Sequence, residues 1–134
     1  MIPLLLALLL ARIPPAVEIG AWAVATGTPM DLALAVAHVE TGHIPESRRD
    51  RARGPGGVGR MQVHPRWGRV LHRDLWDRHQ NIAVGVVLLA CAVRDAGKDA
   101  AAHYNDGRRG TAKGLLYQKK VEIERRRLLP GRSS

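Results

Sequence analysis

The chain has 134 residues, the size of one ordinary domain, and 46% of them are hydrophobic, which is enough to build a core. A single cysteine, Cys91, excludes an internal disulfide framework and a multi-cysteine zinc site. The formal net charge of +9 favours polyanionic partners (nucleic acid, anionic lipid or an acidic cell-wall polymer) without choosing among them.

Residues 1–12 form an apolar N-terminal segment. The run IPLLLALLLA is too short to span a bilayer, which needs about 20 residues. It has the length of a signal-peptide core, but no Lys or Arg precedes it and no clean A-x-A site follows it. Two interpretations stay open: a helix that is buried or docked on a partner in a larger assembly, and a signal or membrane anchor.

Two helices are expected next. Residues 13–27 predict one after a Pro pair, and residues 29–41 predict a second in which apolar side chains recur at helical spacing. Thr28 and Asp31 form the pattern of a capping box at the start of the second helix. Its last turn contains Glu40.

A charged and then glycine-rich stretch, residues 46–57, predicts a solvated loop. Its arginines are either a solvated charge run or an attractor for anionic polymer; they are Arg48, Arg49, Arg51 and Arg53.

The second half of the chain is also helical in pattern. Residues 81–97 are apolar almost all round, which is typical of a central buried helix. Asp99 can start a short helix, and residues 115–129 predict a last amphipathic one. No β-alternation persists, so we expect an all-α, mainly helical fold, with one domain over residues 13–129 and a tail at 130–134.

The stretch HVETGHIP, residues 38–45, suggests metal binding at first sight. His38 and His43 are five residues apart, however, and at about 100° per residue they would diverge by roughly 140° on a helix. Metal-binding histidines on one helix face are four apart. The sequence therefore predicts no metal site, and it contains no signal for a cofactor.

Glu40 is the candidate for acid chemistry. It lies near the negative end of a helix dipole and among apolar neighbours, and both features favour a protonated carboxyl. A carboxyl still protonated near neutral pH is what cleavage of a glycosidic bond needs from its proton donor. From this segment alone, a surface glutamate in a final helical turn stays the alternative.

Four motifs occur in a fixed order: ETGHIP, GGVGRMQVHP, DRHQNI followed by Gly85, and HYNDG. Together they resemble the soluble lytic transglycosylases and their goose-type lysozyme relatives, with matching order and spacing over about residues 15–127. The resemblance implies a lysozyme-like single domain with a glycine-rich groove loop, which cleaves the MurNAc–GlcNAc β-1,4 bond of peptidoglycan.

The resemblance also implies a role for each matched residue. Glu40 would be the general acid and then the base, while Tyr104 would orient Glu40 or contact the sugar. The substrate-binding set that it implies is Thr41, Met61, Gln62, Tyr104 and Asn105.

The chain departs from the family pattern at several points. Arg60 occupies the position of a loop leucine, where it is expected to face solvent or a carboxylate. The segment between Glu40 and Gly59 is about four residues longer than the family pattern, and the excess falls in SRRDRAR. No second carboxylate stands in a matched position, so one acid would have to suffice, with the MurNAc 6-hydroxyl or water completing the reaction.

We therefore expect a peptidoglycan lytic transglycosylase that acts outside the cytoplasm, in the periplasm or cell wall, for local wall opening by a phage virion or secretion-type machine. The N-terminal segment could contact other proteins of such a machine. The alternatives are a muramidase of the same fold, a non-catalytic wall-binding component, and a basic nucleic-acid binder using residues 29–41 and the arginine loop like a helix-turn-helix. The nucleic-acid alternative leaves Met61, Gln62 and the Tyr-Asn-x-Gly motif unexplained.

Overall fold

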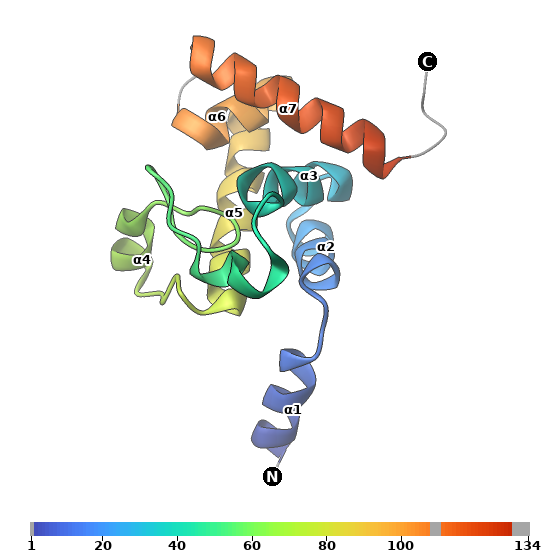
Figure 1. Ribbon diagram of the computed structural model, residues 1–134, viewed down its shortest axis with the longest axis vertical. Helices are drawn as coiled ribbons and strands as arrows, with labels where there is room; N and C mark the ends of the chain where they lie inside the picture. The colour runs from blue at the N-terminus through green and yellow to red at the C-terminus, as the bar shows by residue number, and fades with distance from the viewer. Residues whose placement is uncertain (1, 108–110, 130–134) are drawn as a thin grey trace.

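The computed structural model describes residues 2–107 and 111–129, and all regular elements in those ranges are helical (Figure 1). In chain order they are α1 (Ile2–Ala11), α2 (Pro15–Thr26), α3 (Met30–Thr41), the 3-10 helix η1 (Glu46–Arg51), α4 (Pro65–Leu71), α5 (Arg78–Ala96), the 3-10 helix η2 (Gly97–Asp99), α6 (Ala100–Asp106) and α7 (Ala112–Leu128). Extended pairing in this part of the chain is limited to two isolated β-bridges at Val58. The predicted all-α class is confirmed.

Helix α5 runs through the middle of the helical body, as the apolar pattern of residues 81–97 predicted (Figure 1). It packs against α2 and α6, while α3 packs against α2 and α7. Its inward side chains Ile82, Val86 and Leu89 are fully buried. Residues 78–106 are long and apolar enough to cross a membrane, but a buried core helix meets the same criteria.

The boundaries of α2 and α3 agree with the sequence prediction to within about two residues. The predicted capping box at the start of α3 is wrong. Pro29 occupies the cap position, and the carboxylate of Asp31 accepts a hydrogen bond from Arg125 Nε of α7 at 2.8 Å. A contact between distant helices has replaced a local one, and it ties the first turn of α3 to the end of α7.

Helix α1 projects away from the rest of the molecule (Figure 1). Its described leucines face solvent, and Leu4 and Leu9 are 68% and 56% exposed. The expectation that this segment is buried in the fold is therefore wrong for these side chains. Docking on a partner, and a signal or anchor role, stay predictions.

Two C-terminal features follow from local chemistry. Gly107 ends α6 in the left-handed region at φ 71°, where glycine is favoured. Helix α7 begins at Ala112, three residues before the predicted start, because the Thr111 side chain caps it by accepting a hydrogen bond from Gly114 N. The predicted tail, residues 130–134, lies outside the described residues.

Candidate active site

Glu40 lies in the last turn of α3, with its carboxylate half-buried against α7. The Tyr117 hydroxyl donates a hydrogen bond to Glu40 Oε1 at 2.7 Å. Burial raises the pKa of Glu40 to about 7, and the Tyr117 hydrogen bond and the positive charge of Lys113 limit that rise. The carboxyl is therefore poised to hold or release a proton near neutral pH, and the predicted raised pKa is confirmed.

Tyr117 is a site residue that the sequence analysis missed. Tyr104 was expected to orient Glu40 or to contact the sugar, but the Tyr104 hydroxyl donates to the Met61 carbonyl oxygen at 2.6 Å. Burial, followed by the nearby charge of Glu40, raises the pKa of both phenols well above 10. Both tyrosines are thus neutral hydrogen-bond donors at any working pH. The sequence contained one signal that could have identified Tyr117: helical spacing places it on the same inward face of α7 as Gly114 and Val121.

Thr41 has a structural role where a substrate contact was expected. Its side chain is only 1% exposed, and its hydroxyl donates to the Arg60 carbonyl oxygen at 2.9 Å. The side chain therefore joins the end of α3 to the glycine loop, which we define as residues 54–63. A substrate could not reach this hydroxyl without opening that junction.

Met61 anchors the glycine loop in the core. Its side chain is fully buried against α5, where a Cβ added at Gly85 would lie 2.5 Å from Met61 Cβ. Met61 N donates to Asn81 Oδ1 at 2.9 Å. The expected place of Met61 in a glycan groove does not fit this geometry, because a buried side chain has no surface to offer a sugar.

Gln62 also acts inward. It adopts φ 50°, which is uncommon for a residue with a side chain, and its amide Nε2 donates to the carbonyl oxygens of Gly59 and Ala52 at 2.9 and 3.2 Å. The amide group thus holds the glycine loop closed, and the side chain is half-buried.

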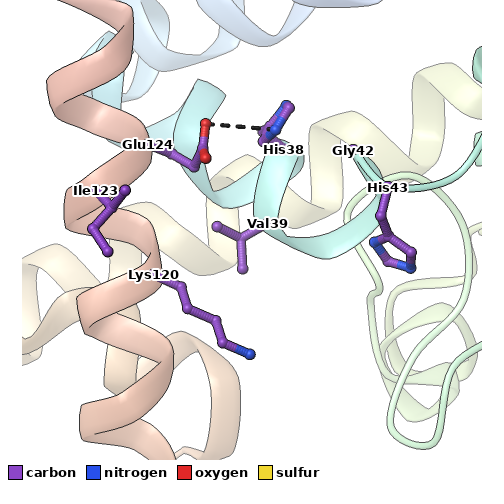
Figure 2. A pocket seen from close by; sticks show the side chains of 7 residues that line it. All are labelled: His38, Val39, Gly42, His43, Lys120, Ile123 and Glu124. Carbon is purple, nitrogen blue, oxygen red and sulfur yellow. Dashed lines mark ion pairs between the residues drawn. The ribbon is translucent and has the colours of Figure 1, made fainter.

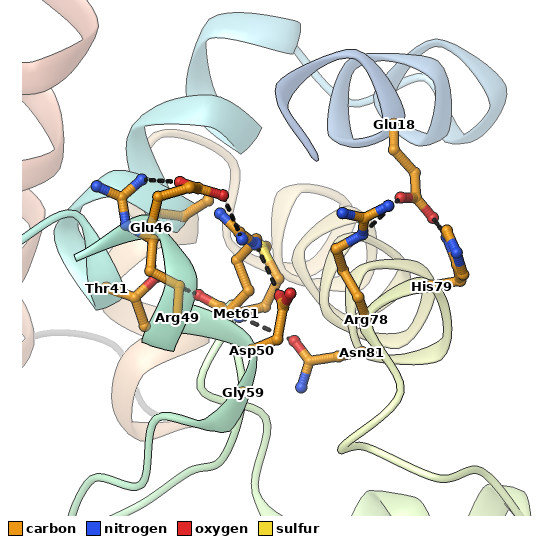
Figure 3. A network of polar contacts seen from close by, with 12 residues as sticks. Glu18, Thr41, Glu46, Arg49, Asp50, Gly59, Met61, Arg78, His79 and Asn81 are labelled. Atoms are coloured by element: carbon orange, nitrogen blue, oxygen red, sulfur yellow. Dashed lines mark hydrogen bonds and ion pairs between the residues drawn. The ribbon is translucent and has the colours of Figure 1, made fainter. Parts of the chain in front are cut away.

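Asn81 joins the glycine loop to α5 (Figure 3). Besides accepting from Met61 N, its amide donates to the carbonyl oxygens of Val58 and Leu75 at 2.9 and 3.0 Å. Gly59 stands beside it at φ 74°, and a Cβ there would come within 2.2 Å of Asn81 Nδ2. The Asn-Ile and Gly-x-Gly patterns of the sequence therefore serve one junction, at which a side chain at position 59 would collide with the amide.

Arg60 is a buried cation with two acidic partners, Glu46 and Asp50, both of which are labelled in Figure 3. Its side chain is 6% exposed; Nε donates to Asp50 Oδ1 at 2.9 Å and Nη2 donates to Glu46 Oε1 at 2.6 Å. The hydrogen bond from Arg60 lowers the pKa of Glu46. Of the two environments expected for Arg60, a carboxylate is confirmed and solvent is wrong.

The stretch after α3 is correspondingly more ordered than the predicted solvated loop. It forms η1, and Arg49 donates from Nε and Nη2 to the carbonyl oxygens of Ile44 and Gly42 at 2.8 and 3.1 Å. Those carbonyls follow the end of α3, so Arg49 fixes the chain as it leaves Glu40. Arg48, Arg51 and Arg53 are exposed.

Asn105 is one of the residues expected to bind substrate, and its side-chain oxygen has no hydrogen-bond partner among the described residues. Its Oδ1 is buried and accepts no hydrogen bond from the described residues. It lies on α6 next to Tyr104, which is within electrostatic reach of Glu40. A ligand could donate an N–H or O–H to this acceptor only if binding opened a path to the buried atom.

A surface pocket of about 310 Å³ lies between the end of α3 and α7 (Figure 2). It is lined by His38, Val39, Gly42, His43, Lys120, Ile123 and Glu124. Glu40 is not part of this lining, although the preceding residue, Val39, and the nearby Gly42 are. The pocket is thus a second feature next to the acid, and the two share the same pair of helices.

The described residues contain no group of three or more His, Cys, Asp or Glu side chains that could hold a metal ion. His38 instead pairs with Glu124, with 3.5 Å between Nε2 and Oε2. Comparison with known proteins finds no family model, no curated protein and no solved structure that matches this chain.

Proposed function

We propose that this protein is a peptidoglycan lytic transglycosylase of lysozyme-like fold, which cleaves the MurNAc-β-1,4-GlcNAc bond with Glu40 as its single catalytic acid. One observation carries the proposal: a half-buried carboxyl with a pKa of about 7, held by a tyrosine hydroxyl at the end of a core helix. A general acid works best when its pKa lies near the operating pH, and glycosidic cleavage needs such an acid.

The proposed reaction uses the two protonation states of Glu40 in turn. The protonated carboxyl donates its proton to the leaving oxygen of the glycosidic bond. The resulting carboxylate is stabilised by the Tyr117 hydrogen bond and by Lys113, both of which lower the pKa of Glu40. It then removes the proton from the MurNAc 6-hydroxyl, which attacks C1 and closes a 1,6-anhydro ring. In the muramidase alternative, water takes the place of that hydroxyl.

The carboxylates that follow α3 support the single-acid route. A conventional glycosidase uses two carboxyl groups that flank the bond. Glu46 and Asp50 are both bound to Arg60, so neither is presented as a second catalytic group. Assistance from the substrate's own acetamido group would replace that second carboxylate.

The sequence motifs support the proposal through the contacts that they make. Residues from all four motifs build one junction, in which Thr41, Asn81 and Tyr104 each bond to the backbone of Arg60 or Met61. The proposed role of this junction is to hold the glycine loop against the end of α3 as one wall of the glycan groove. Asn105, which is half-buried as a whole, is the proposed contact to the sugar, and its buried Oδ1 would have to become accessible when the glycan strand binds.

The nucleic-acid alternative has less support. A recognition helix must enter a DNA groove, whereas α3 is packed between α2 and α7 and buries six of its residues. Arg49 and Arg60 are engaged within the chain. The basic surface suits an anionic wall polymer equally well.

The setting that we propose is local opening of the cell wall by a virion or a secretion-type machine, at a site outside the cytoplasm. The exposed leucines of α1 offer such a machine an apolar contact. Glycan strands remain the proposed substrate, with no cofactor.

Mass spectrometry of peptidoglycan digested by the protein tests the function. We expect 1,6-anhydro products with the wild-type chain and none with Glu40→Gln, which keeps an acceptor for Tyr117. Glu122→Gln is the matched control, since it neutralises an exposed carboxylate on α7 away from Glu40 and should leave the products unchanged. Reducing ends in place of anhydro ends would identify a muramidase, and intact glycan strands with the wild type would refute the proposal.

A further inference from the structure

Helix α4 and the loop that leads from it to α5 leave several apolar side chains facing solvent. No residue of α4 is buried. Val70 and Leu71 are 64% and 43% exposed, and Trp76 in the loop is 44% exposed. Other residues hold this segment to the body, since Leu75 is buried and Trp67 packs against the core. The exposed apolar side chains are therefore not needed to attach the segment, and together they form a surface that a partner can cover.

The same segment is basic, and its charge is not neutralised within the chain. Arg66 and Arg69 are three residues apart on α4 and share one helix face, and Arg73 follows in the loop. All three are exposed, and none forms an ion pair with any of the described residues. Asp74 is the single acidic residue between positions 64 and 76, so this stretch keeps a net positive charge. We define the α4 surface as Arg66, Arg69, Val70, Leu71, Arg73 and Trp76.

Trp76 brings a fourth arginine to the α4 surface. The guanidinium carbon of Arg53 lies over the Trp76 ring, 5.6 Å from its centroid, and Arg53 is exposed and outside every ion pair of the described residues. An exposed indole beside guanidinium groups suits the boundary between lipid headgroups and acyl chains, where tryptophan is enriched. A hydrophilic polyanion such as nucleic acid would match the arginines but leave Val70 and Leu71 in water.

Helix α1 leaves the body next to this loop (Figure 1). Arg78 begins α5 two residues after Trp76. Its Nη2 donates to the carbonyl oxygens of Ala11 and Ile13 at 3.5 and 3.4 Å, so the loop and the C-terminal end of α1 are neighbours. All 10 residues of α1 are apolar, which leaves the helix without a polar face. A protein groove covers one stripe of a helix, whereas lipid surrounds it.

We propose that the α4 surface docks on an anionic lipid bilayer, with its arginines among the headgroup phosphates and α1 inserted into the acyl chains of the facing leaflet. Guanidinium groups bind phosphate through paired N–H donors, and Trp76 and Val70 would lie at the acyl boundary. The 10 residues of α1 extend about 15 Å, which reaches the middle of a hydrocarbon core of about 30 Å. No residue of this surface takes part in the proposed reaction, so the inference stands independently of the proposed function.

Vesicle co-sedimentation of the full chain tests the proposal. One set of vesicles is phosphatidylcholine alone, and in the other half of the lipid is phosphatidylglycerol, at about 0.15 M salt. We expect binding at least about tenfold tighter to the anionic vesicles, together with a blue shift of tryptophan fluorescence. Trp76→Phe should remove most of that shift, because Trp67 is half-buried and Trp22 lies on α2. Equal binding to the two kinds of vesicle, or none, would overturn the inference.

Two double variants separate the α4 surface from the overall charge of the chain. Arg69→Glu with Arg73→Glu should weaken binding to the anionic vesicles at least about tenfold. Lys119→Glu with Arg126→Glu makes the same charge change at two exposed positions of α7, and it should leave binding within about threefold. Equal losses in the two double variants would contradict a docking site at α4.

The apolar part of the proposal has its own test. Leu5→Asn with Leu9→Asn changes two exposed side chains of α1 and should weaken binding to both kinds of vesicle by the same factor, while the preference for anionic lipid stays. Unchanged binding would overturn the insertion of α1.

A short DNA duplex, at the same phosphate concentration as the anionic vesicles, separates lipid from a soluble polyanion. The wild type should bind the duplex at least about tenfold more weakly and without the fluorescence shift, because a duplex offers no acyl chains to Trp76. Duplex binding as tight as vesicle binding would overturn the lipid assignment in favour of nucleic acid.

Discussion

At the scale of single residues, Glu40 couples stability to function. Its pKa in the fold, about 7, lies above the ordinary value of 4.5, so folding disfavours the ionised form. The stability that the protonated Glu40 contributes is therefore fully present below pH 4.5 and falls as pH rises toward 7, by roughly 3 kcal/mol for a shift of this size. Above pH 7 the loss is complete.

The variant Glu40→Gln should escape this loss, because an amide does not ionise and can still accept the Tyr117 hydrogen bond. We expect it to be more stable than the wild type by about 2–3 kcal/mol at pH 8 and nearly equal to it at pH 4. Urea unfolding at the two pH values measures this. A difference that does not change with pH would show that the carboxyl is not perturbed.

Tyr117 should set the upper pH limit of activity. Its hydrogen bond lowers the pKa of Glu40, so Tyr117→Phe should raise that pKa and move the alkaline limb of the kcat/KM profile to higher pH. The plateau should also fall, by about tenfold, because the acid loses its orientation. Tyr104→Phe, which removes only a bond to the Met61 carbonyl, should leave the limb in place. Identical shifts in both variants would contradict this assignment.

Sequence could predict Glu40 because its signal is local: a helix end, apolar neighbours and a motif. It could not predict Tyr117, which comes from 77 positions further along the chain. Helical spacing marks Tyr117 as inward-facing but says nothing about which group its hydroxyl meets. The same limit explains Thr41 and Met61, because motif matching cannot tell a residue that binds substrate from one that shapes the loop.

At the scale of elements, the contact between the glycine loop and α5 depends on a missing side chain. A Cβ at Gly85 would lie 2.5 Å from Met61 Cβ, so Gly85→Ala should destabilise the fold by about 1–3 kcal/mol despite the better helix propensity of alanine. Gly20→Ala in α2 is the matched control, since its Cβ would approach nothing nearer than Met30 Sδ at 3.4 Å. Urea unfolding should show a loss for the first variant and none for the second; equal effects would count against close packing at Gly85.

The elements themselves were predictable where one face is buried. The central helix and the last helix follow from apolar spacing, and Gly107 marks the end of α6. The structure of the insertion after α3 was not predictable. A run of charged residues predicts a solvated loop unless a buried, oppositely charged partner for some of them is known. Arg60 is that partner, and it gathers Glu46 and Asp50 into η1.

At the scale of the whole molecule, the helical body should fold without α1. The described leucines of α1 face solvent, and the helix meets the body through Arg78, whose Nη2 donates to the Ala11 carbonyl oxygen at 3.5 Å. Deletion of residues 2–11 should therefore change the free energy of unfolding by less than about 1 kcal/mol. Urea unfolding of the shortened chain tests this, and a larger loss would mean that α1 packs on the body.

Composition and periodicity predicted the all-α class because the spacing of apolar residues that marks the buried face of a helix can be read within each segment alone. They could not place α1, since an apolar run looks the same whether it is buried, docked or exposed. Nor could they predict the pocket between α3 and α7, which requires two helix faces to meet.

The pKa of Glu40 tests the central claim most directly. Carbon-13 NMR of the Glu40 carboxyl, assigned by comparison with Glu40→Gln, gives the titration of this one group across pH 3 to 9. We predict a midpoint near pH 7, matched by the alkaline limb of kcat/KM for glycan cleavage. A midpoint near 4.5 would contradict the account, because Glu40 would then be an ordinary ionised carboxylate with no proton to donate at neutral pH.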